Sequence, residues 1–391
     1  MTDNQPGIEL PWHLGDGLVL RAATADDVQA LEDFNARIHG DEKPDPRVGV
    51  AVRNLLQGRL PTCGPQDFTV VEDAGGRIVS SLCLLSQTWS YAGIRFPAGQ
   101  PEFVGTDPQY RNRGLVRKQF DVVHQWARQR GQMMLGITGI PYYYRLFDYE
   151  MTLDLDGWHG GYEANVPALA ADASEPYLVR PALEADLDFI NQCFEYGQRH
   201  RLVVNHRSRE EWRYELLSKD EGHVNYRVMR IIQTPEGEPL GFFNYYPYLD
   251  TSMVVCTFCE LKPGVSWLAV APAVIRAVWQ GGQEVAASTQ EPCKMFCFSL
   301  AEDHPLFTAA EANMPRRRDP YAWYIRVPDL KAFLRLITPV LEQRLAESLC
   351  AGHTGELTLG FYRSALCLRF EQGRLAEIND WQQDTSHWPM A

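Results

Sequence analysis

A short sequence pattern occurs twice in this chain, and it constrains the fold more than any other feature. The segment LVRPALEADLDFI, which starts at Leu178, repeats the pattern of VLRAATADDVQAL, which starts at Val19. Two identities stand 159 positions apart, Arg21 with Arg180 and Asp27 with Asp186. Because equivalent turns, apolar helices and strands follow at nearly the same spacing, two copies of one domain type are the simplest explanation.

The first copy combines antiparallel strands with helices in an irregular order. Hydrophobic periodicity and turn residues predict strands over 18–23, 68–71, 78–85, 94–106 and 133–137, and helices from 24, over 50–60, over 114–130 and over 142–147. Because strands and helices do not alternate regularly, we expect a mixed α/β fold and not a sheet of regular parallel units.

A chain of 391 residues is too long for one hydrophobic core, and its segments differ in composition. Residues 157–176 are rich in Gly and Ala and are interpreted as a linker between the two copies. After residue 320, a helix over 330–345, interrupted by Pro339, precedes alternating strands, which predicts a small α+β unit. We expect three domains, over 1–158, 174–320 and 321–391.

Composition narrows the class of protein. Hydrophobic residues make up 45% and charged residues 22% of the chain, as in an ordinary globular enzyme. There is no run of about eighteen apolar residues, and the polar N-terminus lacks the pattern of a secretory signal, so we expect a cytoplasmic protein without a membrane span. The formal net charge of -13 argues against nucleic acid as a main partner. It is compatible with a cationic substrate, and equally with a charge that only maintains solubility.

The nine cysteines are expected to be reduced thiols, since no export signal accompanies them. The spacing of Cys256 and Cys259, together with Cys293 and Cys297, superficially fits a zinc site. Residues three apart on a strand point to opposite faces, so Cys256 and Cys259 would not converge on one metal ion. We therefore expect no metal site.

The strongest chemical signal is the segment VGTDPQYRNRGLVRK, residues 104–118. Pro108 marks a turn after a strand, and an amphipathic helix begins near Gly114. Cations crowd the start of that helix, where its dipole disfavours them: Arg111, Arg113, Arg117 and Lys118. A bound anion would reverse the penalty, because the first backbone N–H groups of a helix are free to bind it. A solvated basic surface that binds nothing is the alternative.

This segment resembles the acetyl-CoA loop of the GNAT superfamily of N-acyltransferases, whose motif is Arg/Gln-x-x-Gly-x-Gly/Ala. Arg111 and Gly114 match the motif, and Val116 replaces its final small residue, as in the similar Arg-rich loop of the Eis-like branch. The resemblance implies acetyl-CoA as co-substrate, with its pyrophosphate on the loop backbone and its pantetheine arm along the preceding strand. The implied cofactor-binding residues are Val104, Thr106, Arg111, Asn112, Arg113, Gly114, Leu115, Val116 and Arg117.

Transfer of an acetyl group from a thioester to an amine needs a base for the amine and an acid for the departing thiolate. Tyr144 lies in IPYYYRLFDY, residues 140–149, which resembles the Tyr-x-x-x-Gly-Phe/Tyr element that carries the acid in this superfamily, with Asp148 in place of the Gly. Glu102 is a candidate base, because it lies four residues before Thr106 on one strand and would point the same way. A solvated edge carboxylate is the alternative for Glu102. By resemblance to Eis-like proteins, the terminal carboxylate of Ala391 is a second candidate base.

The second copy lacks these features. The positions 159 residues after Arg111 and Gly114 are Val270 and Ala273, and Phe307 stands near the place of Tyr144. This asymmetry resembles Eis-like proteins, which have an active GNAT domain, a degenerate one and a sterol-carrier-like C-terminal domain. The resemblance implies tandem GNAT folds and a homo-oligomer, with a C-terminal domain here short enough to be incomplete.

The predicted function is acetyl-CoA-dependent N-acetylation of a primary amine by direct transfer. The expected acceptor is a small molecule resembling an aminoglycoside or a polyamine, or else a protein lysine. The alternative is a CoA-binding or assembly protein with a GNAT fold that has lost its chemistry.

Overall fold

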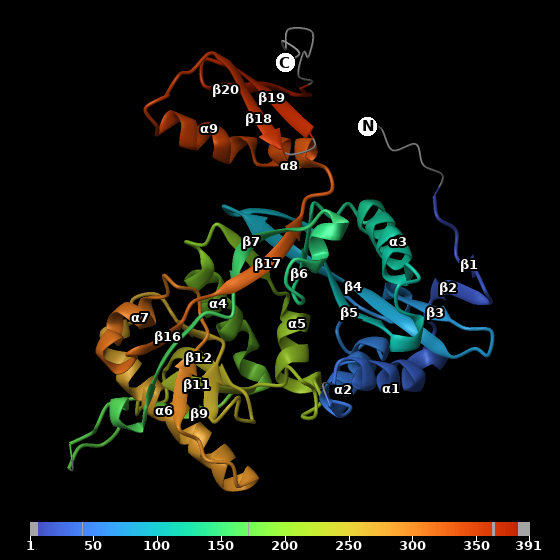
Figure 1. Ribbon diagram of the computed structural model, residues 1–391. Coiled ribbons are helices and arrows are strands. Elements are labelled where there is room, and N and C mark those ends of the chain that lie inside the picture. The colour runs from blue at the N-terminus through green and yellow to red at the C-terminus, as the bar shows by residue number, and fades with distance from the viewer. Residues whose placement is uncertain (1–6, 41, 171, 362–363, 382–391) are drawn as a thin grey trace, which may run out of the picture.

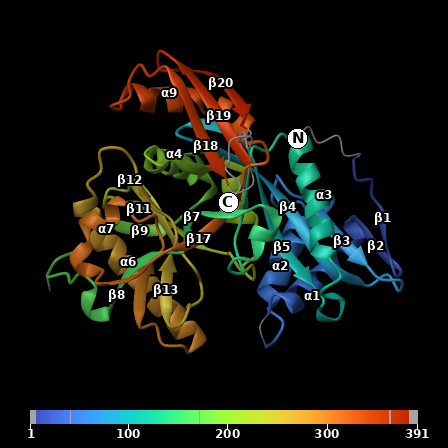
Figure 2. The same cartoon turned by 45° about the horizontal axis from the view of Figure 1, so that its top comes forward.

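A computed structural model describes residues 7–40, 42–170, 172–361 and 364–381. Figure 1 shows two lobes side by side, the first built mainly from the N-terminal part of the chain and the second from its middle, with a small third unit beside them. Figure 2, turned by 45°, shows the same three parts. No helix within the described ranges is both long enough and apolar enough to cross a membrane.

The first lobe is built on one nine-stranded sheet, in the order β1-β2-β3-β4-β5-β6-β17-β7, to which β10 adds by pairing with β4. Its neighbouring strands are antiparallel except β5 and β6. The strands are β1 (Trp12–Gly15), β2 (Leu18–Ala22), β3 (Phe68–Glu72), β4 (Ile78–Tyr91), β5 (Ile94–Thr106), β6 (Met134–Ile137), β7 (Glu150–Leu155), β10 (Val203–His206) and β17 (Tyr321–Arg326).

Helices cover both faces of this sheet. Strand β4 alternates between the two cores: Cys83 packs with α1 (Val28–Ile38) and α2 (Pro46–Leu56), whereas Leu82 and Leu84 pack with α3 (Leu115–Gln129) or its neighbours. Short 3-10 turns complete the lobe at η1 (Ala25–Asp27), η2 (Pro65–Asp67), η3 (Pro108–Tyr110) and η4 (Tyr143–Phe147). The expected mixed α/β fold is thereby confirmed.

The second lobe contains two four-stranded sheets, in the orders β14-β12-β11-β9 and β13-β15-β8-β16. Their strands are β8 (Trp158–Tyr162), β9 (Leu178–Pro181), β11 (Val228–Gln233), β12 (Pro239–Tyr245), β13 (Met253–Cys256), β14 (Cys259–Leu261), β15 (Met295–Phe298) and β16 (Arg316–Arg318). The helices and turns are η5 (Glu163–Asn165), η6 (Glu184–Asp186), α4 (Leu187–Gln198), α5 (Arg209–Arg213), the π-helical turn η7 (Tyr214–Ser218), α6 (Trp267–Thr289), α7 (Pro305–Ala309) and η8 (Glu311–Asn313).

The repeated sequence pattern has the same local structure in both lobes. The guanidinium of Arg21 donates to both carboxylate oxygens of Asp27, at 2.8 and 2.9 Å, and Arg180 does the same to Asp186, at 2.7 Å each. Each aspartate also accepts a hydrogen bond from the backbone N–H three residues before it. The repeated residues therefore form a bidentate ion pair that joins a strand to the helix after it.

Strand pairing ties the lobes together in ways that the sequence pattern did not indicate. Residues 158–162 were expected to be part of a linker, but they form β8 and pair with β15 and β16 in the second lobe. Strand β17 follows the second lobe in sequence, yet it lies in the first sheet between β6 and β7. Residues 321–326, assigned to the third segment by sequence, are therefore part of the first sheet, because backbone pairing is a long-range property.

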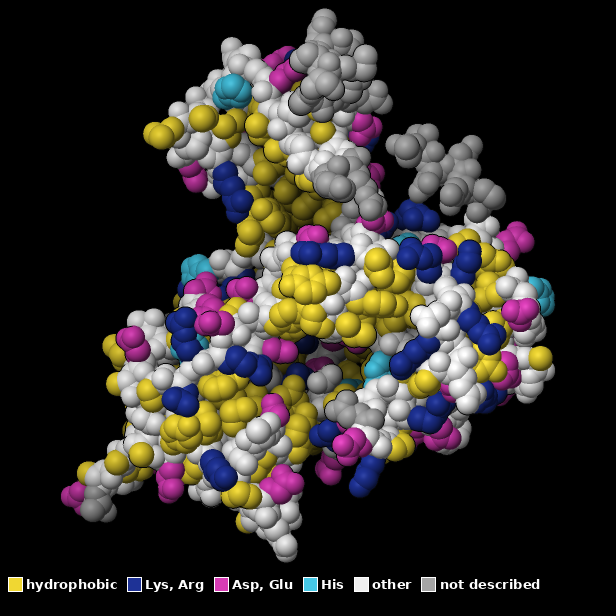
Figure 3. All heavy atoms as spheres, in the orientation of Figure 1, with side chains coloured by type: hydrophobic (Ala, Val, Ile, Leu, Met, Phe, Trp, Pro, Cys, Tyr) yellow, Lys and Arg dark blue, Asp and Glu magenta, His cyan; other side chains and the backbone are white. Residues whose placement is uncertain are grey.

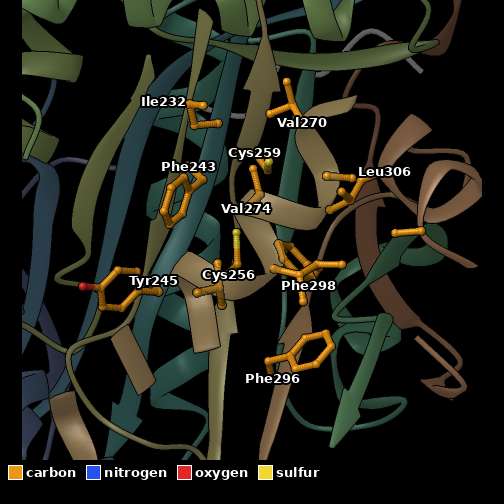
Figure 4. Close-up of a cluster of buried hydrophobic side chains, with 14 of the residues drawn as sticks. Ile232, Phe243, Tyr245, Cys256, Cys259, Val270, Val274, Phe296, Phe298 and Leu306 are labelled. Atoms are coloured by element: carbon orange, nitrogen blue, oxygen red, sulfur yellow. The ribbon is translucent and has the colours of Figure 1, made fainter. Parts of the chain in front are cut away.

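The expectation that Cys256 and Cys259 lie on opposite faces is wrong. Both thiols are buried in one hydrophobic cluster with α6, which Figure 4 shows in close-up. The strand breaks between them, since the side-chain carbonyl of Asn244 accepts hydrogen bonds from the backbone N–H groups of Thr257 and Phe258, at 2.9 Å each. This irregularity cancels the alternation that a continuous strand would impose.

The third unit packs α8 (Leu330–Leu336) and α9 (Thr338–Ala346) on the antiparallel sheet β18 (Gly355–Phe361), β19 (Ser364–Glu371) and β20 (Arg374–Asp380). The helix breaks at Ile337, and Pro339 lies in the first turn of α9, as its sequence predicts. Phe333 of α8 contacts the rings of Tyr91 and Phe96 in the first lobe, at centroid distances of 5.9 and 5.6 Å. Figure 3 shows hydrophobic side chains gathered on the face below this unit.

Candidate active site

Helix α3 begins with an uncapped first turn. Gly114 adopts a left-handed conformation, with φ of 73°, and offers no side-chain hydrogen bond to the helix. The first intrahelical bond at this end runs from Lys118 N to Gly114 O, at 3.1 Å. The N–H groups of residues 115–117 therefore have no acceptor within the helix and are available to an anion.

A cavity of about 550 Å³ lies against this helix start. Of the residues implied by the family resemblance, eight line it: Val104, Thr106, Arg111, Asn112, Gly114, Leu115, Val116 and Arg117. Arg113 does not line the cavity, and its guanidinium instead lies 5.1 Å from the centroid of the Tyr110 ring. The structure thus brings most of these residues together and places Arg113 at the outer side of the loop.

The cations at the helix start are held by aromatic rings and carbonyl groups. Arg111 Nε lies 3.4 Å from Thr106 O, at the limit of a hydrogen bond. The guanidinium of Arg117 is 3.4 Å from Leu146 O and lies over the Phe147 ring, so it links the helix start to η4. Lys118 Nζ lies over the ring of Trp12, 4.5 Å from its centroid. None of these contacts supplies an opposite charge, and the one carboxylate of Asp121 on the same helix interacts electrostatically with both Arg117 and Lys118.

Strands β5 and β6 separate beside this cavity. They pair only at Ala98 and Gly99, so the edge of β5 beyond Gly99 has no strand partner on that side within the described part of the chain. Phe103 has a positive φ of 53°, and the register with β4 shifts next to it. The edge at Val104 and Thr106 is therefore not covered by a strand and is open to an extended ligand, although Thr106 O is also near Arg111 Nε.

The bulge also changes where Glu102 points. The sequence predicts that Glu102 and Thr106 share one face, but Thr106 lines the first cavity and Glu102 lines a second one. That prediction is wrong because the left-handed residue Phe103 interrupts the two-residue alternation of the strand. The second cavity has a volume of about 1070 Å³ and lies between the lobes. Glu102 of the second cavity interacts electrostatically with Tyr144 of the first, so the two cavities lie near each other.

Glu102 is held by a chain of hydrogen bonds along β4 and β5. Gln100 Nε2 donates to the Glu102 carboxylate, Gln87 Nε2 donates to Gln100 Oε1 at 2.8 Å, and Trp89 Nε1 donates to Gln87 Oε1 at 2.6 Å. Burial raises the pKa of Glu102 above its ordinary value. A positioned carboxyl group with a raised pKa is suited to take a proton near neutral pH.

Tyr144 lies in η4 with its ring packed against Phe120 and Tyr324. Its side chain is 6% exposed and borders the first cavity, and its hydroxyl has no hydrogen-bond partner among the described residues. Burial and the nearby charge of Glu102 raise the pKa of Tyr144, so the phenol is protonated at neutral pH. Tyr143 also lines the cavity, whereas Tyr142 is largely exposed and donates its N–H to Tyr324 Oη.

Two residues of the first cavity had no signal in the sequence. Ile38 and His39, at the end of α1, complete its wall. The His39 ring packs edge-on against Phe103, and burial lowers the pKa of His39. Only packing of α1 on the sheet brings them here. The other candidate base, the carboxylate of Ala391, lies outside the described residues.

The second lobe has a smaller cavity of about 220 Å³, between the end of α4, strand β14 and the start of α6. These elements correspond in order to α1, β5 and α3. Its lining includes the ring of Trp267 and charged residues of both signs, which are Glu260, Asp303, Arg199, Arg201 and Lys262. Phe307 is buried and stacks on His159, with a centroid distance of 4.0 Å.

Comparison with known proteins agrees with this geometry. A family model described as an acetyltransferase (GNAT) domain matches residues 19–152. A search of curated proteins finds no match. Similar solved structures include a probable N-acyltransferase from Enterococcus faecalis V583, with 13% identity and a TM-score of 0.62, covering 93% of this chain and 86% of that chain.

Two further solved structures are GCN5-related N-acetyltransferases. The one from Kribbella flavida has 16% identity and a TM-score of 0.59, covering 94% of this chain and 84% of its own. The one from Anabaena variabilis ATCC 29413 has 13% identity and a TM-score of 0.60, covering 94% of this chain and 86% of its own. At such identities the likeness concerns the fold. Residues 19–152 therefore match an acetyltransferase (GNAT) domain, a match that supports acyltransferase activity.

Proposed function

We propose that this protein transfers the acetyl group of acetyl-CoA directly to a primary amine. One observation carries the proposal: the open helix start and Tyr144 border one cavity, and Glu102 borders the larger one nearby. A thioester in the first cavity and an amine in the second would meet beside strand β5.

The residues of the first cavity fit coenzyme A. Its pyrophosphate would accept hydrogen bonds from the free N–H groups of residues 115–117, and Arg111 and Arg117 would add charge. Gly114 lets a pyrophosphate approach the backbone closely, because the space that a Cβ would fill contains no protein atom within 4 Å. The positive φ at this position also favours glycine over other residues. The pantetheine amides would pair with the free edge at Val104 and Thr106.

In the proposed reaction, the Glu102 carboxylate takes a proton from the ammonium group of the acceptor. The neutral nitrogen attacks the thioester carbonyl, the C–N bond forms and the C–S bond breaks. The electron pair leaves with the thiolate, which takes the proton of Tyr144 Oη. The product nitrogen loses its second proton to solvent, Glu102 releases the proton that it took to solvent, and Tyr144 is reprotonated from solvent. No covalent intermediate on the protein is needed, and the neighbouring thiol of Cys83 is buried with a raised pKa, which disfavours a role as nucleophile.

We propose that the second lobe, residues 174–320, is a degenerate copy of the first, residues 1–158, and that 321–391 contribute a sterol-carrier-like accessory unit. The equivalent Arg-Asp ion pairs support the duplication. The corresponding cavity of the second lobe is small, about 220 Å³, and Val270 and Ala273 stand 159 positions after Arg111 and Gly114, so one cofactor site per chain is expected. Self-association, implied only by the Eis resemblance, is tested by light scattering.

Free-thiol release from acetyl-CoA in the presence of a panel of amines tests the function. The panel should include polyamines, aminoglycosides, amino acids and lysine peptides. Thiol release that requires both an amine and intact Glu102 supports the proposal. Calorimetric binding of CoA without turnover on any amine would instead favour a CoA-binding protein without chemistry.

A further inference from the structure

The part of the large cavity that the second lobe lines carries a group of cations, of which Lys219 is buried and Arg207 and Arg227 are partly buried. This wall comes from the second lobe, from the residues that follow β10 to the start of β11, and faces the first lobe across the hollow between them, visible in Figure 3. The cations are Arg207, Lys219 and Arg227. His223 belongs to the same wall, but burial lowers its pKa to about 3, so it is neutral at pH 7.

Carboxylates within this wall neutralise these cations only in part. Glu215 accepts a hydrogen bond from Lys219 Nζ at 2.7 Å and lies 3.7 Å from the Arg227 guanidinium. Glu211 also lines the cavity, but its carboxylate accepts the backbone N–H of Ser208 at the start of α5. Arg207, Lys219 and Arg227 are therefore accompanied by two carboxylates, and one carboxylate, that of Glu211, is bound to the start of α5.

Among these cations, Arg207 is the one whose N–H donors have no hydrogen-bond acceptor among the described residues. Its guanidinium lies over the rings of Trp212 and Phe258, at 5.1 and 4.9 Å from their centroids. It makes no hydrogen bond or ion pair with any described residue, and burial lowers its pKa. A guanidinium presents five N–H donors, so a cavity-lining Arg207 without a protein acceptor is prepared for an acceptor on a ligand.

Two further polar atoms of this wall are buried without a partner among the described residues. They are Tyr214 Oη and Arg227 Nε. Tyr214 is 4% exposed, so solvent does not compensate its hydroxyl. Unpaired buried donors are costly, so a ligand that accepts hydrogen bonds from them would be stabilised here.

The opposite side of the same cavity is acidic. Glu102 lies there on β5, and Asp154 and Asp156 line the rim from the end of β7. Asp303 lines the cavity too, but Arg201 pairs with it. The first lobe thus lines this cavity with carboxylates, whereas the second lobe lines it with four cations, including Arg201, and with three carboxylates, which are Glu211, Glu215 and Asp303.

We propose that the second lobe forms an anion subsite for the acceptor, centred on Arg207 with Lys219 and Arg227. This inference rests on the proposed function. The acceptor is accordingly an amine that also bears a carboxylate, with its ammonium group toward Glu102 and its carboxylate toward Arg207. A purely cationic polyamine or aminoglycoside leaves this subsite unmatched. The degenerate lobe then has a role in substrate recognition.

Matched pairs of acceptors that differ only in the carboxylate test the subsite. Suitable pairs are lysine with 1,5-diaminopentane, ornithine with 1,4-diaminobutane, and phenylalanine with phenethylamine. We expect kcat/KM to be about ten- to a hundredfold higher for the carboxylated members, as for a charge-assisted contact. Equal or better use of the decarboxylated members would overturn the inference.

The variant Arg207→Gln, which breaks no protein hydrogen bond, should remove most of this preference by raising KM for the carboxylated acceptor. KM for acetyl-CoA should not change. Arg209→Gln is the matched control, because Arg209 is exposed, pairs with Asp188 and does not line the cavity. An unchanged preference in Arg207→Gln, with native circular dichroism, would also overturn the inference.

A binding measurement separates failure of the subsite from failure of the chemistry. The CoA-loaded protein is titrated calorimetrically with N-acetylphenylalanine and with N-acetylphenethylamine. Binding of the former only, lost in Arg207→Gln but kept in Arg209→Gln, supports the subsite even where no amine is acetylated. Equal binding of both compounds contradicts it.

Discussion

Tyr144 is the residue on which the proposed proton transfer to the thiolate depends. We expect Tyr144→Phe to lower kcat about a hundredfold or more, because general acid catalysis contributes roughly that much. The ring packing against Phe120 and Tyr324 is preserved by Phe, so the fold should not change. Thiol release under saturating acetyl-CoA measures kcat. Tyr143→Phe is the control at the same cavity, and an equal loss in both variants would argue against a specific role for Tyr144.

Glu102 should impose an acidic limb on the pH profile of kcat/KM. Only the carboxylate can accept a proton, and burial raises the pKa of Glu102, so activity should rise with pH through a value above that of an exposed glutamate. Glu102→Gln should remove this limb together with most of the activity. A profile of the same shape in the variant would show that another group is the base.

The raised pKa of Glu102 also predicts how the free energy of unfolding depends on pH. The dependence is opposite to that of a carboxylate in an ion pair, whose pKa is lowered. Since the folded-state pKa of Glu102 is raised, the folded state binds more protons than the unfolded state as pH rises above about 4.5. Stability from this group is therefore complete at lower pH and is lost as pH rises through the raised pKa. Urea unfolding should show Glu102→Gln more stable than the native protein at pH 7, with the difference shrinking toward pH 4. Glu236→Gln, at an exposed turn, should show no such trend.

At the scale of elements, the start and the end of helix α3 provide a matched pair of glycines. Gly114 and Gly131 both have positive φ, of 73° and 63°, and a Cβ would meet nothing within 4 Å at either. Each Gly→Ala change should lower the free energy of unfolding by about 1 kcal/mol, the cost of a left-handed alanine. Only Gly114→Ala should also weaken CoA binding in calorimetry, because only that end carries the free N–H groups. Equal CoA affinity in both variants would place the pyrophosphate elsewhere.

Elements were predictable where the signal was local. The start of α3, its amphipathic face and the break before Pro339 follow from neighbouring residues, and the structure has them close to the predicted positions. The bulge at Phe103 was not predictable, because nothing in a bulky β-strand residue indicates a positive φ. The wrong prediction that Glu102 and Thr106 point the same way follows from that one residue.

For the whole molecule, the position of strand β17 in the first sheet determines where we expect the chain to tolerate truncation. A protein ending after residue 328 keeps β17 between β6 and β7 and should unfold cooperatively, at a lower temperature because Phe333 no longer covers Tyr91 and Phe96. A protein ending at residue 319 loses β17, including the fully buried Tyr324, and should not fold. Thermal unfolding followed by circular dichroism distinguishes the two. Equal stability would mean that β17 does not hold the first sheet together.

The amino-acid sequence by itself determined the local chemistry of this protein. It determined the duplicated Arg-Asp pattern, the mixed α/β order, the glycine and cations at one helix start, and the tyrosine that follows the next strand, since each depends on residues close in sequence. Tertiary structure alone decided that β8 and β17 cross between the lobes, that Ile38 and His39 line the first cavity, and that Arg207 and Glu102 line the second one together. These arrangements rest on backbone pairing and packing between residues more than a hundred positions apart or on separate elements, which no short sequence pattern encodes.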